Sequence, residues 1–171
     1  FGVTVAERIK KLFVPLFDPS TESLSPEVLA INQYIEKHAG YSLYDAQLAV
    51  AEAIKRQLER SKVGLIVAEC GVGKSKIGAT SIAAVAAGLA SHQRSAKLAK
   101  TFNLVLCPSH VTDKWVRELE ETVPNSFAAV VHTPTELDSL YQMFERGSKS
   151  CYAILSKEKA RDGYMRAPAV I

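Results

Sequence analysis

One short segment constrains the fold of this 171-residue chain more than any other, because it joins two apolar segments of different character. Val63 to Ala68 is a short run with β-branched residues, typical of a buried parallel strand. Gly71 and Gly73 follow, and the Ala-rich segment from about Lys74 to Ala90 has the composition of a buried helix. A strand, a tight turn and a helix in direct succession predict an α/β fold.

The rest of the chain continues this alternation. Apolar runs and turn residues predict strands at about 102–107, 127–131 and 151–155, and helices at about 26–38, 44–60, 110–122 and 134–146. Thr133 to Glu136 forms a capping box, and a short helical turn is expected after Ser156. Strands alternating with helices predict a parallel sheet with helices on both faces, behind a partly helical extension at 1–40.

The helix at 44–60 is predicted to be amphipathic. Val50 and Ile54 belong to its apolar face, whereas Glu52, Lys55 and Arg56 belong to its polar face. In a parallel sheet the ligand binds at the carboxyl ends of the strands. The loops after the strands, including those after Ala68 and Cys107, are therefore expected to form the ligand-binding edge of the sheet.

The segment 68–75, Ala-Glu-Cys-Gly-Val-Gly-Lys-Ser, has the pattern of a phosphate-binding loop. Its glycines allow backbone N–H groups to surround a phosphate, and the following helix directs its positive end at the anion. Lys74 could reach the outer phosphates of a nucleotide, and the Ser75 hydroxyl could bind Mg²⁺. Ala68 stands where the strict pattern has glycine.

This segment resembles motif I of superfamily-two helicases and Swi/Snf-type translocases, in which Ala at the first position is usual. The resemblance implies a P-loop NTPase fold, a RecA-like lobe, that binds ATP and Mg²⁺. It assigns catalytic roles to Lys74 and Ser75 and the metal contact to Ser75. The implied nucleotide-binding residues are Gln47, Glu69, Cys70, Gly71, Val72, Gly73, Lys74, Ser75 and Lys76.

Two further segments support the resemblance. Leu43 to Gln47 is similar to the segment upstream of motif I whose Gln contacts adenine, and an amide can donate and accept there at once. The segment 106–119 resembles motif Ia, and the resemblance implies that Ser109 and His110 contact nucleic acid. A surface role for Gln47 remains open. Trp115 is expected to pack its helix against the sheet.

The chain lacks a second acidic motif at the end of an apolar strand, which magnesium-dependent hydrolysis requires. Both ends appear cut, and in the family the missing motif and the arginine fingers lie further along. We therefore expect 41–171 to be part of a RecA-like lobe of a nucleic-acid-dependent ATPase that binds ATP without appreciable turnover alone. Another P-loop ATPase, or a kinase-like protein that does not act on nucleic acid, stays open.

Composition adds weaker constraints. A formal net charge of +3 is compatible with nucleic acid, DNA rather than RNA, as the partner. Arg94, Lys97 and Lys100 recur at helical spacing. They form either a face that contacts the phosphate backbone of a nucleic acid or an ordinary solvent-exposed face. Three widely spaced cysteines favour a reducing compartment, and no apolar run is long enough to span a membrane, so a cytoplasmic protein is expected.

Overall fold

The computed structural model describes residue 4, residues 15–92 and residues 100–161. Its sheet consists of three parallel strands in the order β1-β3-β2, which confirms the predicted α/β class and the parallel sheet. The strands are β1 (Phe102–Cys107), β2 (Ser126–Val130) and β3 (Ser150–Ser156). The helices are α2 (Pro26–Ala39), α3 (Asp45–Ser61), α4 (Lys74–His92), α5 (Thr112–Thr122), α6 (Pro134–Arg146) and α7 (Lys157–Arg161), with a 3₁₀ turn at Ser109–Val111.

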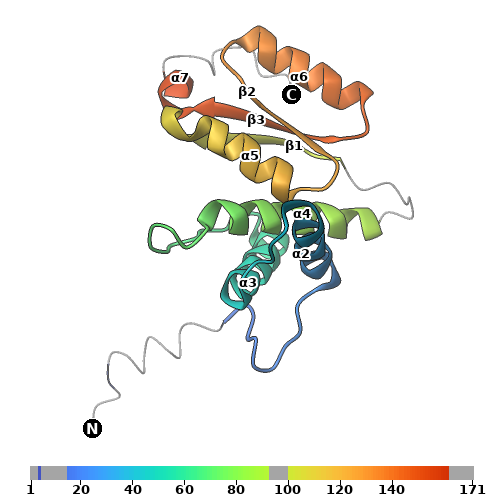
Figure 1. The fold of residues 1–171 in the computed structure, drawn as a ribbon, viewed down its shortest axis with the longest axis vertical. Coiled ribbons are helices and arrows are strands. Elements are labelled where there is room, and N and C mark those ends of the chain that lie inside the picture. Colours follow the sequence, from blue (N-terminus) through green and yellow to red (C-terminus); the bar gives the residue numbers. More distant parts are fainter. Residues whose placement is uncertain (1–3, 5–14, 93–99, 162–171) are drawn as a thin grey trace.

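The elements are stacked in layers (Figure 1). α6 covers one face of the sheet and α5 covers the other. α4 crosses beyond α5, and α2 and α3 pack on its far side. Helices therefore lie on both faces of the sheet, as predicted.

The central strand β3 supplies both cores, because successive side chains of a strand point to opposite faces. Tyr152 and Ile154 belong to a core that also contains Ile35 of α2. Ala153 and Leu155 belong to the smaller core under α6. Since α2 shares the larger core with β3, the helix that precedes residue 41 packs on the same body as the sheet.

Helix ends follow the predicted signals. α2 begins at Pro26 and ends before Gly40, whose φ of 77° is favourable for glycine. The Thr133 side chain accepts a hydrogen bond from the Glu136 N–H and so caps α6. The Ser156 hydroxyl accepts from the Lys159 N–H, which confirms the helical turn after β3.

The predicted strand from Val63 to Ala68 is wrong for this structure. The segment has no strand partner among the described residues, and Leu65 and Val67 are 81% and 86% exposed. Its apolar composition, which predicted burial, requires neighbouring strands on both sides, whereas the described sheet ends at β1.

The predicted faces of α3 are also wrong in part. Val50 is exposed, whereas Glu52 and Lys55 of the expected polar face are buried. Ion pairs and hydrogen bonds make this burial favourable, and the apolar face instead lines a groove beside the segment 63–68.

Among the described residues, no helix is long and apolar enough to cross a membrane. Residues 5–14 of the expected extension at 1–40, and the predicted basic residues Arg94 and Lys97, lie outside the described part of the chain.

Candidate functional site

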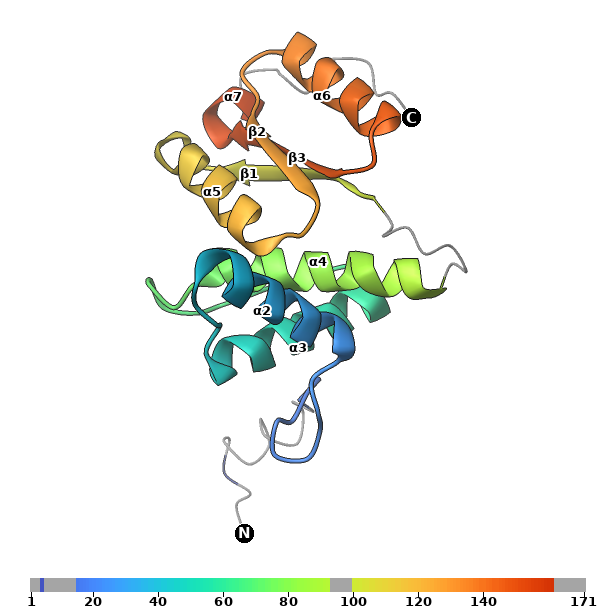
Figure 2. The ribbon, with the colours of Figure 1, turned by 45° about the vertical axis from the view of Figure 1, so that its right-hand side comes forward.

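The glycine-containing loop forms a tight turn directly before α4 (Figure 2). Gly71 and Gly73 have φ values of 90° and 85°, a conformation that residues with a Cβ adopt at a cost. The N–H groups of Gly71, Val72 and Gly73 have no acceptor in the described part of the protein. The first N–H groups of a helix also lack partners within it, so loop and helix together present a set of donors.

Lys74 stands on the first turn of α4, where motif I predicted it. Its Nζ donates hydrogen bonds to the carbonyl oxygens of Ala68 and Glu69, at 2.9 and 2.6 Å. No carboxylate among the described residues pairs with Lys74. The ammonium is therefore held over the loop by neutral acceptors, and its charge remains available to an anion.

A cavity of about 740 Å³ opens in front of this loop. Lys74, Ser75 and Lys76 line it from the start of α4, and Tyr41, between α2 and α3, and Lys114, on α5, line it as well. A cavity of this size is within the usual range for small-molecule sites.

Ser75 fits the metal role in part. Mg²⁺ in nucleotide sites takes one or two protein ligands together with phosphate oxygens and water, and the Ser75 hydroxyl lines the same cavity as Lys74. The one carboxylate in the lining belongs to Glu118, which is paired with Lys76. The described residues contain no cluster of three or more His, Cys, Asp or Glu side chains that could hold a metal.

Gln47 joins α3 to the loop. Its Nε2 donates to the carbonyl oxygen of Val72 at 3.0 Å, and its Oε1 accepts from the Tyr44 N–H at 3.0 Å. The side chain therefore contacts the loop 68–75 directly, and it also lines the cavity. Its predicted contact with adenine stays a prediction, because both ends of the amide are engaged within the protein.

Lys76, predicted as a nucleotide contact, has carboxylate partners. Its Nζ lies 2.6 Å from Glu121 Oε2, to which it donates, and 3.0 Å from Glu118 Oε2, which it faces as an ion pair without hydrogen-bond geometry. The ammonium also lies 5.1 Å from the Tyr41 ring centroid. Although burial acts in the opposite direction, these acceptors raise the pKa of Lys76, so the residue stays charged.

The remaining predicted loop residues lie at the surface. Glu69 and Cys70 are exposed, and Val72 is 39% exposed. All three cysteines are free thiols, with Cys107 and Cys151 buried. Burial raises the pKa of the thiols of Cys107 and Cys151, so these two are less reactive than an ordinary cysteine.

Ser109 and His110 lie in the 3₁₀ turn after β1, at the carboxyl edge of the sheet, and His110 is exposed. His132 follows β2 at the same edge, and its Nδ1 lies 3.0 Å from the Lys159 Nζ. The predicted edge therefore gathers polar side chains from three strand ends. Lys100, one of the basic residues noted in the sequence, instead contacts the end of α6. Its Nζ donates to the carbonyl oxygens of Phe144, Glu145 and Gly147.

Sequence reasoning missed Tyr41, Lys114 and Glu118 as cavity residues. Lys114 and Glu118 stand in the helix predicted at about 110–122, where charged residues on a surface face carry no distinctive signal. Only the packing of α5 beside the start of α4 brings them to the loop.

The comparisons with known proteins add no assignment: no protein-family model matches the chain, and no curated protein does.

Proposed function

We propose that this chain binds ATP with Mg²⁺ at the loop 68–75, as part of a nucleic-acid-dependent ATPase of the helicase or DNA translocase kind. The observation that carries the proposal is the placement of Lys74. It stands at the start of a 19-residue helix, after a turn with two glycines at positive φ, and its charge has no carboxylate partner among the described residues. Such a site attracts an anion of several charges.

In this proposal the loop N–H groups and Lys74 bind the phosphate chain, and Ser75 contributes one ligand to Mg²⁺. The bound ion would neutralise phosphate charge and orient the outer phosphates. Lys76 acts differently from a direct ligand: its pairs with Glu118 and Glu121 join the first turn of α4 to α5.

The nucleic-acid part of the proposal depends on the resemblance to motif Ia and on the exposed polar groups at the carboxyl edge. Ser109 and His110 are placed after β1, beside the end of the central strand β3. Phosphate contacts from loops of this kind position a nucleic acid without reading its sequence.

The test is a titration with a fluorescent ATP analogue and Mg²⁺, comparing the wild type with Lys74→Ala and with Lys149→Ala. Lys149 is an exposed lysine before β3 and serves as the control for a lost surface charge. Binding is expected to be lost in Lys74→Ala and kept in Lys149→Ala. Equal binding by all three proteins would refute the site.

The same samples are expected to release little phosphate, because the sequence lacks the second acidic motif. Repeating the titration with single- and double-stranded DNA tests the partner. DNA binding that weakens steeply with added salt supports the motor function, whereas nucleotide binding without any DNA binding would favour a P-loop ATPase of another kind.

A further inference from the structure

The charges around the cavity are unevenly compensated. Three lysines and one glutamate line it: Lys74, Lys76, Lys114 and Glu118. Lys76 is the one that takes the carboxylate of Glu118, and it takes Glu121 as well. Lys74 is held by carbonyl oxygens, which do not cancel its charge.

Lys114 is the cavity lysine that has no partner among the described residues. It is exposed on α5 and has no ion pair or hydrogen bond with any residue that the structure describes. Lys114 and Glu118 are four residues apart on a helix, a spacing at which a lysine and a glutamate often pair. Here Glu118 pairs with Lys76 instead, and Lys114 lines the cavity without a carboxylate partner among the described residues.

The position of Lys114 differs from that of an ordinary surface lysine. It lines the cavity together with Lys74 and Ser75, although it belongs to a helix that lies about 40 residues further along the chain. The Lys76 pairs with Glu118 and Glu121 hold α5 against α4, so the distance between Lys114 and the loop is set by packing.

We infer that Lys114, on α5, is a second cationic contact for the phosphate chain of the bound nucleotide. This inference rests on the proposed nucleotide site and deepens it: the ligand is a polyphosphate that contacts both the loop and α5. The two unneutralised ammonium groups, on Lys74 and Lys114, match a ligand with several negative charges rather than a neutral one.

The test compares binding of Mg²⁺-ATP and of inorganic tripolyphosphate by the wild type, Lys114→Ala, Lys114→Arg and Lys149→Ala. Lys114→Ala is expected to weaken both ligands about fivefold, the size of one partly solvated charge pair. Lys114→Arg should restore most of the affinity, and Lys149→Ala should leave it unchanged. The salt dependence of ATP binding should be shallower in Lys114→Ala.

The outcomes separate this inference from the proposed function. If the wild type binds ATP and Lys74→Ala does not, but Lys114→Ala binds both ligands as the wild type does, the role of Lys114 is wrong and the site stands. A loss for ATP alone, with tripolyphosphate unaffected, would place Lys114 against the nucleoside and also overturn the inference. A wild type that binds neither ligand would overturn both proposals.

Discussion

At the scale of single residues, Gly73 leaves little room for any side chain. A Cβ at this position would lie 2.5 Å from Gln47 Nε2, the same atom that donates to the Val72 carbonyl. Gly71 has a similar positive φ, yet a Cβ there would meet nothing within 4 Å. Comparing an alanine substitution at Gly71 with one at Gly73 therefore distinguishes the cost of backbone strain from the cost of displacing Gln47.

We expect Gly71→Ala to reduce the free energy of unfolding by about 1 kcal/mol, the usual cost of a positive φ for alanine. Gly73→Ala should cost more, because Gln47 must also move, and it should weaken ATP binding more. Urea unfolding and ATP titration of both variants measure this. In a Gln47→Ala background the difference between the two substitutions should shrink, and an unchanged difference would show that Gln47 is not its cause.

At the scale of elements, the sequence predicted most helices and strands within one or two residues. β1 and α6 are capped or bounded by strong local signals, Pro108 after the strand and Thr133 before the helix. The failures concern the segment 63–68 and the faces of α3. Periodicity reports which residues are apolar, and it cannot report whether a neighbouring strand is present or whether a buried Glu52 has partners.

The exposed segment gives a direct prediction about stability. Leu65 is 81% exposed and Leu155, on the central strand, is 2% exposed. Leu155→Ala is expected to reduce the free energy of unfolding by about 3 kcal/mol, because a buried leucine leaves a cavity. Leu65→Ala should change it by less than about 0.5 kcal/mol. Urea unfolding of the two variants measures the difference, and comparable losses would mean that Leu65 is packed in solution.

In the candidate site, too, the sequence predicted what depends on neighbouring residues and missed what depends on packing between helices. The loop 68–75 could be identified from the sequence, because its residues are adjacent in the chain and each type has a chemical reason to be there. Lys114 could not, because its place in the cavity depends on the packing of α5 against α4. The sequence also placed Lys76 with the nucleotide, since it carries no sign of the two carboxylates on α5 that pair with it.

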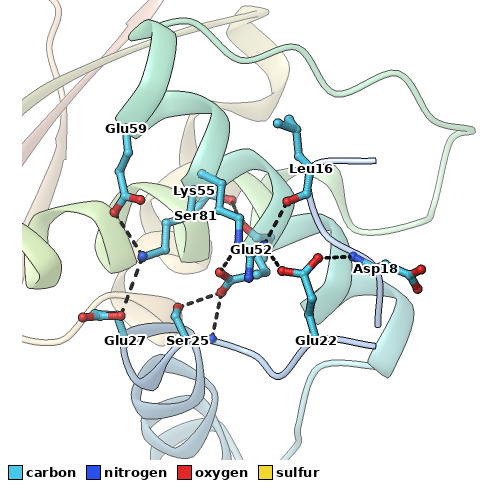
Figure 3. A network of polar contacts seen from close by, with 11 residues as sticks. Leu16, Asp18, Glu22, Ser25, Glu27, Glu52, Lys55, Glu59 and Ser81 are labelled. Carbon is cyan, nitrogen blue, oxygen red and sulfur yellow. Dashed lines mark hydrogen bonds and ion pairs between the residues drawn. The ribbon is translucent and has the colours of Figure 1, made fainter. Parts of the chain in front are cut away.

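At the scale of the whole molecule, a polar network around the buried carboxylate of Glu52 ties the segment before α2 to the middle of α3 (Figure 3). Glu52 accepts hydrogen bonds from the N–H and the hydroxyl of Ser25, at 3.0 and 2.6 Å, and from Arg56 Nε at 2.9 Å. Arg56 in turn donates to the Leu16 carbonyl and to Glu22. The Glu52 carboxylate thus links residues 16–25 to α3, directly through Ser25 and indirectly through Arg56.

This network predicts a pH-dependent loss of stability. Burial alone would raise the pKa of Glu52. Hydrogen bonds from Ser25 and Arg56 outweigh this effect and hold the pKa below its ordinary value in the folded state. A lowered pKa contributes stability that is present above the unfolded pKa and is lost as the pH falls through the folded pKa. The folded protein should therefore lose this contribution on acidification, and the loss should depend on Glu52.

We expect Glu52→Gln to reduce the free energy of unfolding by about 2 kcal/mol near neutral pH, because the charge that strengthens the hydrogen bonds from Ser25 and Arg56 is lost. At acidic pH, below the lowered pKa of Glu52, the difference from the wild type should narrow, since protonation removes the charge from Glu52 as well. Glu120→Gln, which changes an exposed carboxylate of α5 that has no ion pair among the described residues, is the control and should have a small effect. Urea unfolding at the two pH values decides the matter: a Glu52→Gln loss that stays constant with pH would mean that the Glu52 charge does not hold the network together.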